Sequence, residues 1–138
     1  MVKELLSRFK AQQSFILFLC LYILASFIGM YYTPLFDEDE GFFAEAARHM
    51  LATSDYITVT VNGELRYDKP ALFFWFTALS MKIFGQNEFA VRLPSFIFFL
   101  CLLRLLYHFG KKYLSQNAAQ NAIIITISLV QFQVLSRQ

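Results

Sequence analysis

Charged residues are scarce in this sequence. Only 16% of its 138 residues are Asp, Glu, Lys or Arg, whereas soluble domains carry about 25%. The hydrophobic share is 57%, and 17 residues are Phe. A soluble domain of this size would have to bury those rings in one small core, which surface-to-volume scaling makes difficult. The composition therefore disfavours a soluble domain and favours an integral membrane protein.

Cysteine pairs and basic clusters are also missing. The two cysteines, Cys20 and Cys101, each lie inside an apolar run, and no CxxC spacing typical of a metal site is present. The net charge is +2, and no basic cluster is interleaved with aromatic residues, so we expect no nucleic-acid partner. The sequence also contains no internal repeat and no low-complexity linker.

The first apolar run, Ser14–Tyr32, contains no charged residue. At a rise of about 1.5 Å per residue it is long enough to cross a hydrocarbon core of ~30 Å. It predicts a first transmembrane helix over 14–33. The preceding segment 1–13 carries three basic residues and one acidic residue. The positive-inside rule therefore places this tail in the cytoplasm and the following residues outside it.

A cleaved signal peptide is the competing interpretation of this run. Signal peptides have an apolar core of about 7–15 residues, which ends at a small-residue cleavage site. The run here ends in Gly29-Met-Tyr-Tyr-Thr-Pro, which lacks such a site. We therefore expect an uncleaved anchor.

Residues 34–90 form the predicted first extracytoplasmic loop, which contains most of the acidic residues of the chain. Apolar residues recur at helical spacing from Phe42 to Leu51, which predicts a helix over about 39–53. Acidic residues crowd its start, where carboxylates suit capping and the helix dipole. Its Phe-rich face favours a position along the membrane surface.

The segment after this helix alternates apolar and polar residues. Ile57, Val59 and Val61 alternate with threonines, and Asn62-Gly63 is a strong signal for a tight turn. A short hairpin and a plain extended loop are both compatible with this pattern.

The apolar run Ala71–Phe84 is short for a transmembrane span, and it either spans the membrane or lies along it. If it spans, the next helix ends outside and places Lys111-Lys112 on the wrong side. If it lies on the outer surface, these lysines are cytoplasmic, as the positive-inside rule favours. We therefore predict a second surface helix over about 70–84.

The remaining topology follows from that choice. A second transmembrane helix is predicted over 91–110, a cytoplasmic loop over 111–120 and a third transmembrane helix over 121–136. The fold class is thus all-α and integral to the membrane, with about three transmembrane helices and two surface helices. The N-terminus is cytoplasmic and the acidic loop is extracytoplasmic.

Two acidic clusters and one lysine lie at the predicted lipid boundary. Asp39-Glu40 begins the first surface helix, and Asp68-Lys69 precedes the second. A carboxylate at this boundary can orient or deprotonate a hydroxyl or bind a cation, and a lysine can bind a phosphate. Asp39 as a helix cap and Lys69 as an interfacial anchor are the structural alternatives.

These residues resemble a known family. The strings PLFDEDEGFFAEAARHM and SDYITVTVNGELRYDKPALFFWFTALSMKIFGQNEFAVRLPS are similar to the N-terminal part of bacterial lipid-linked-sugar glycosyltransferases, namely the aminoarabinose (lipid A) transferases and their allies, the protein O-mannosyltransferases. The resemblance covers about residues 10–138. It implies a GT-C fold in the bacterial inner membrane and a polyprenyl-phosphate-linked sugar donor. The implied acceptor is a lipid, a glycan or a protein.

The resemblance also implies roles for individual residues. Asp39 matches the family's first-loop aspartate and is followed by Glu40, so the pair is implied to bind and activate the acceptor. Lys69 matches the lysine that contacts the carrier-lipid phosphate. Asp68 matches an acidic residue that binds a metal in some members. That residue is a glutamate there, so a divalent metal at Asp68 is left open, with polar support as the other role.

The chain departs from the family in length and in Gly41-Phe42, which replace a polar residue and an aromatic of the motif. Family members have several hundred residues, so we expect either a fragment of a full enzyme or a remnant, and expect 138 residues alone to be inactive. A small membrane anchor or assembly protein with an acidic outer loop is the alternative function. A transporter fragment is a weaker third interpretation, because no apolar helix carries a midplane acid pair.

Overall fold

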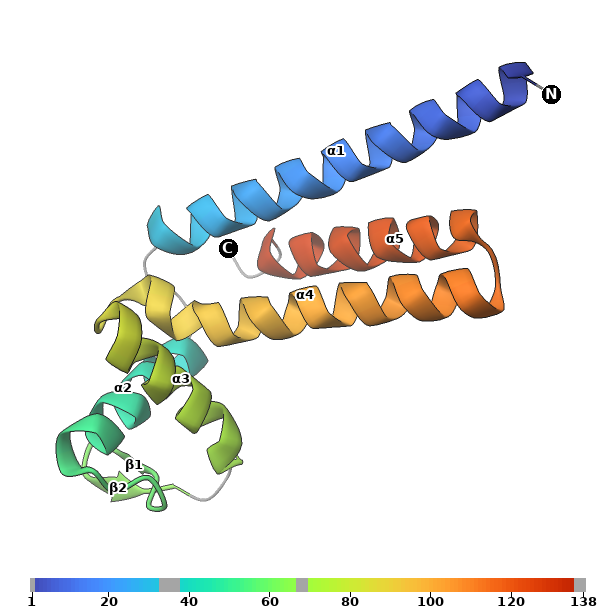
Figure 1. Cartoon of the computed structure of the whole chain (residues 1–138). Coiled ribbons are helices and arrows are strands. Elements are labelled where there is room, and N and C mark those ends of the chain that lie inside the picture. The colour runs from blue at the N-terminus through green and yellow to red at the C-terminus, as the bar shows by residue number, and fades with distance from the viewer. Residues whose placement is uncertain (1, 33–37, 67–69, 136–138) are drawn as a thin grey trace. The chain divides into compact units, whose positions relative to one another are not determined.

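A computed structural model describes the backbone of residues 2–32, 38–66 and 70–135, and the side chains of residues 12–32, 40–66 and 70–129. The elements in chain order are α1 (Val2–Tyr32), α2 (Glu38–Thr53), β1 (Thr60–Val61), β2 (Glu64–Leu65), α3 (Ala71–Phe84), α4 (Glu88–Tyr113) and α5 (Gln116–Leu135) (Figure 1). They form two compact units, 1–96 and 97–138.

The helix α2 is the centre of the first unit, because it packs on both of its sides. Ala44 and Ala47 belong to a buried cluster with residues of α3 and the start of α4. Ala46 and Met50 belong to a second cluster with the hairpin and Phe74 of α3. The small alanine side chains allow the neighbouring elements to approach α2 closely. The acidic N-terminus of α2 is thereby fixed to a packed core.

The segment after α2 forms a short hairpin, so the extended-loop alternative is not the one observed. The strands β1 and β2 are antiparallel, with Thr60 opposite Leu65 and Val61 opposite Glu64. The two residues between them, Asn62 and Gly63, have φ angles of 53° and 82°. Positive φ at both central positions is what a type I′ turn requires, and Asn-Gly adopts it readily.

The helix α3 begins after Pro70 and ends at Gly85, whose φ of 88° suits a residue without a side chain. One face of α3 is buried against α2 through Phe74, Ala78 and Met81. The opposite face exposes large apolar side chains at helical spacing. These are Leu72, Trp75, Phe76, Leu79 and Ile83. A helix that is buried on one side and apolar on its exposed side suits a protein–lipid boundary.

The second unit contains the part of α4 from Ile97 onward, together with α5. Leu114 and Ser115 separate the two helices, and the Ser115 hydroxyl accepts a hydrogen bond of 3.1 Å from the backbone N–H of Ala118. Both helices therefore extend into the segment 111–120, which its polar composition had predicted to be a loop. A serine cap allows α5 to begin directly after the two-residue turn.

Two segments among the described residues are long and apolar enough to cross a membrane, Gln12–Tyr32 and Glu88–Tyr113. They overlap the spans predicted over 14–33 and 91–110. Of α5, only residues 116–129 have described side chains, and this stretch is shorter than a membrane span. The third span over 121–136 and the sidedness of all segments stay predictions.

Candidate functional site

The first turns of α2 carry the acidic pair predicted from the sequence. Asp39 is the second residue of this helix and Glu40 is the third. The side chain of Asp39 lies outside the described residues, as do Asp68 and Lys69 entirely. Of the predicted site residues, Glu40 is thus the one whose side-chain contacts are known.

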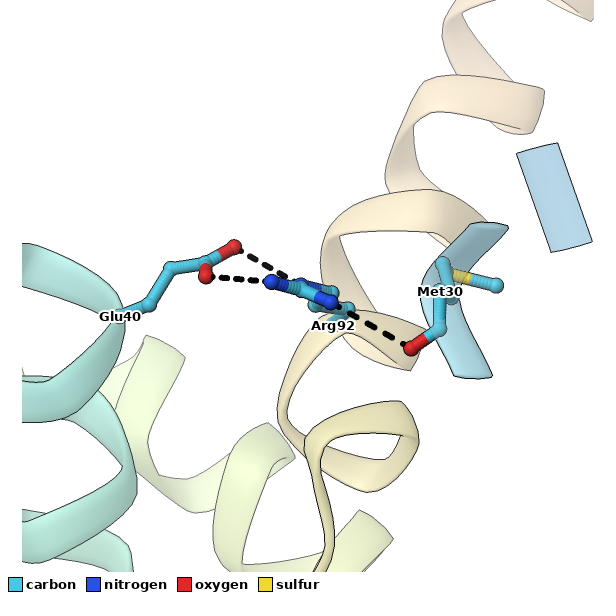
Figure 2. Close-up of polar contacts among 3 residues, drawn as sticks. All are labelled: Met30, Glu40 and Arg92. Carbon is cyan, nitrogen blue, oxygen red and sulfur yellow. Dashed lines mark hydrogen bonds and ion pairs between the residues drawn. The ribbon is translucent and has the colours of Figure 1, made fainter. Parts of the chain in front are cut away.

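Glu40 forms a bidentate ion pair with Arg92 in the first turns of α4 (Figure 2). Arg92 Nε donates a hydrogen bond of 3.0 Å to Glu40 Oε1, and Arg92 Nη2 donates one of 2.8 Å to Glu40 Oε2. The two side chains keep only 15% (Arg92) and 32% (Glu40) of their surface exposed. Paired geometry of this kind is the strongest form of an arginine–carboxylate contact.

The same guanidinium also reaches the end of α1. Arg92 Nη1 donates a hydrogen bond of 3.4 Å to the backbone carbonyl oxygen of Met30 (Figure 2). Because α1 ends at Tyr32, this carbonyl belongs to the last turn, which lacks partners within the helix. Arg92 therefore links three helices of the first unit, a role that sequence reasoning missed.

One sequence signal points to Arg92 in retrospect. It is a charged residue near the start of an apolar run, and charged residues in such runs usually pair with one another or with backbone carbonyls. The sequence does not say which carboxylate is the partner, because Glu40 lies 52 residues away.

Four phenylalanine rings connect the start of α2 with the start of α3. The ring centroid of Phe43 lies 4.6 Å from that of Phe73 and 5.4 Å from that of Phe74. On the other side of the undescribed segment 67–69, the Arg66 guanidinium lies 6.0 Å from the centroid of the Phe42 ring. The described residues on both sides of 67–69 thus contact α2 within one turn of Glu40.

A capped turn follows the C-terminal end of α2. Asp55 Oδ1 accepts hydrogen bonds from the backbone N–H groups of Ile57 (2.9 Å) and Thr58 (3.1 Å). A hydrogen bond from the Thr58 side chain and these backbone bonds lower the pKa of Asp55 below its ordinary value of 3.8, with a smaller contribution from His49. This carboxylate stabilises the turn that leads into the hairpin.

No group of three or more His, Cys, Asp or Glu side chains that could hold a metal ion is found within the described residues. Asp68, the residue for which a metal was left open, lies outside them.

The fold is similar to that of a solved membrane enzyme. The crystal structure of ArnT from Cupriavidus metallidurans in the apo state matches with a TM-score of 0.72 and 25% sequence identity, over 80% of this chain and 20% of that chain. The helical arrangement, with its two membrane-length segments, is that of a GT-C glycosyltransferase.

The sequence comparisons give the family. Residues 68–138 match the dolichyl-phosphate-mannose-protein mannosyltransferase family, and the chain belongs to this family. The undecaprenyl phosphate-alpha-4-amino-4-deoxy-L-arabinose arabinosyl transferase of Wigglesworthia glossinidia brevipalpis is 31% identical over 94% of this chain. The transferase of the same name from Aeromonas hydrophila is 37% identical over 45% of this chain.

The chain spans only part of the length of these relatives. It covers 23% of the Wigglesworthia protein and 11% of the Aeromonas protein. The activity, substrates and partners of the whole relatives therefore enter only as proposals for this chain.

Proposed function

We propose that this chain is the N-terminal part of a glycosyltransferase that moves a sugar from a polyprenyl-phosphate carrier to an acceptor hydroxyl at the outer face of the inner membrane. The acceptor class is a lipid, a glycan or a protein. The observation that carries the proposal is the position of Asp39-Glu40 in the first turns of α2, directly after the first membrane-length helix. That position supports a role for these carboxylates at the lipid boundary, where a lipid-linked donor would present its sugar.

The proposed reaction is a direct displacement. The acceptor oxygen attacks the anomeric carbon, and the bond between that carbon and the carrier phosphate oxygen breaks with inversion. Asp39 takes the proton of the acceptor hydroxyl as a general base. Lys69 stabilises the negative charge that develops on the leaving phosphate. The products are the glycosylated acceptor and the free polyprenyl phosphate.

The described contacts support one shared site for these residues. Arg66 and Phe73, on either side of 67–69, contact Phe42 and Phe43 in the turn that follows Glu40. Lys69 is three residues beyond Arg66 in the sequence, and an extended chain advances by at most ~3.6 Å per residue. Lys69 is therefore proposed to act beside Asp39 on the same donor.

The role of Asp39 is tested by transfer assays in membranes. The chain is expressed from its gene together with any coding sequence that continues it. Asp39→Asn keeps a side chain of the same size and removes the base, so we expect a fall in kcat of about 10²–10⁴-fold. Asp37→Asn, in the same acidic cluster, is the matched control and is expected to retain activity. Normal turnover in Asp39→Asn would overturn the proposed role.

The donor is tested with two carrier-linked sugars, aminoarabinose and mannose, each on an undecaprenyl-type phosphate. Transfer from either carrier supports the proposed reaction class, and the preferred sugar gives the donor specificity. Absence of transfer from both, in protein shown to be folded and inserted, contradicts the proposal.

The proposed topology is tested by cysteine labelling. Cys20 and Cys101 are first replaced by Ala, and single cysteines are placed at Gln86 and Lys111, which are both exposed. A membrane-impermeant reagent added outside should label position 86 in intact cells and position 111 only after permeabilisation. A cytoplasmic position 86 would show that 71–84 spans the membrane.

A further inference from the structure

We infer that Arg92 is a positioning residue that holds the N-terminal turn of α2, and with it Asp39, against the end of α1. The inference rests on the proposed function for its catalytic consequence. Its structural basis is independent of that function, because it depends on the contacts of Arg92 with Glu40 and Met30.

The burial of the pair makes its loss costly. Arg92 has only 15% of its side chain exposed, and a charge that is withdrawn from water needs a partner. The comparison on the same helix is Glu45–Arg48, where the closest atoms are 3.6 Å apart and both side chains are 44% exposed. An exposed pair of this kind contributes little, so α2 carries one structural ion pair and one weak pair among its described residues.

The charges of the two helix ends favour the observed direction of the pair. Glu40 lies in the first turn of α2, where the helix dipole favours negative charge. The Met30 carbonyl lies in the last turn of α1, where the dipole favours a cation. Arg92 is therefore attracted by the carboxylate of Glu40 and by the C-terminal end of α1, and its planar fork fixes the angle of approach in a way that a lysine does not.

The hydrogen bonds also divide the roles of Asp39 and Glu40. Both carboxylate oxygens of Glu40 accept hydrogen bonds from Arg92, so Glu40 is engaged in holding the helix. Asp39 is the adjacent residue and turns with the same backbone. Glu40 and Arg92 act together on the position of Asp39, and the base of the reaction is Asp39 alone.

A spin label can report the position of this turn without any assay of transfer. Gly41 is suitable because a Cβ built there meets no atom within 4 Å. In the chain lacking Cys20 and Cys101, a nitroxide on Gly41→Cys should become more mobile with Arg92→Gln or Glu40→Gln. The matched control substitution Glu45→Gln should leave the spectrum of the Gly41→Cys label unchanged. A label on Ala52→Cys, at the other end of α2, should keep the same spectrum when Arg92→Gln or Glu40→Gln is introduced.

The two substitutions should also be coupled. Combining Arg92→Gln with Glu40→Gln should add little to the mobility change of either single variant, because both remove the same interaction. Arg92→Lys, which keeps the charge without the fork, should give an intermediate spectrum. Label mobility in Arg92→Gln equal to that of the unsubstituted chain would overturn the inference.

Kinetics separate positioning from mere stability. We expect Arg92→Gln to lower kcat per folded molecule about 10–100-fold while the KM for the donor stays within about twofold, and Arg92→Lys to recover part of the loss. An unchanged kcat per folded molecule overturns the positioning role. Absence of transfer in the unsubstituted protein counts against the proposed function, whereas the label spectra still decide whether Arg92 holds α2.

Discussion

The indole N–H of Trp75 in α3 donates a hydrogen bond of 2.6 Å to the backbone carbonyl oxygen of Tyr56, in the turn between α2 and β1. This bond joins the hairpin side of the first unit to the helix that exposes an apolar face. Trp75 is also the single tryptophan of the chain. Its fluorescence therefore reports on α3 alone.

We predict that Trp75→Phe weakens the first unit by about 1 kcal/mol, because an aromatic ring is kept at this position while one hydrogen bond is lost. Thermal unfolding in detergent measures the change. Leu79→Met, on the same exposed face, is the control and should have a smaller effect. Equal stability of Trp75→Phe and the unsubstituted chain would show that the Tyr56 carbonyl finds another donor.

A second prediction concerns the depth of α3 in the membrane. In the Trp75→Phe background, single tryptophans at Leu79 and Ile83 are compared with native Trp75 by quenching with lipids labelled at known depths. A surface helix places all three at similar depth. A spanning helix would place each one about 6 Å deeper than the one before, since four residues rise by that distance, and this result would contradict the surface position.

A third prediction contrasts two glycines. A Cβ at Gly110 would lie 2.9 Å from the Cα and Cβ atoms of Ala119, so we expect Gly110→Ala to destabilise the second unit by ~1–3 kcal/mol through overpacking. Gly41→Ala is the matched control in open space. It should stabilise the first unit by ~0.5–1 kcal/mol, because alanine restricts the unfolded chain and favours the helix. The same sign for both substitutions in thermal unfolding would refute the close approach of Gly110 to Ala119.

A fourth prediction concerns pH. Because hydrogen bonds lower the pKa of Asp55 below 3.8 in the folded chain, its stabilising effect is complete above the unfolded pKa of about 3.9 and is lost as the pH falls through the lower folded value. Carboxyl NMR in detergent should give a midpoint below 3.8 for Asp55. Thr58→Val should raise this midpoint, and Thr60→Val should leave it unchanged. An Asp55 midpoint that is the same with and without Thr58→Val would contradict the role of the Thr58 hydrogen bond.

Much of the local structure could be predicted from sequence. The apolar spacing from Phe42 to Leu51 indicates a helix there, and α2 covers this segment. Asn62-Gly63 is a turn signal whose backbone preference is intrinsic, and both residues have the positive φ that it requires. These features depend on neighbours in the chain, so periodicity and residue type are enough to find them.

Some residues of the candidate site could be predicted from the sequence and others could not. Residue type and position in the chain pointed to Asp39 and Glu40 at a helix start, and the family resemblance added Asp68 and Lys69. Arg92 received no role, because a charge in an apolar run does not specify which carboxylate balances it.

The sequence by itself determined the membrane character, the order of the helices and the place of the acidic turn, since each follows from composition or short-range spacing. Tertiary structure alone decided that Arg92 joins Glu40 to the last turn of α1, that Trp75 binds the Tyr56 carbonyl, and that Gly110 meets Ala119. The physical reason is that these contacts depend on which helix faces meet. That choice is set by packing of the whole unit, and no local pattern of residues encodes it.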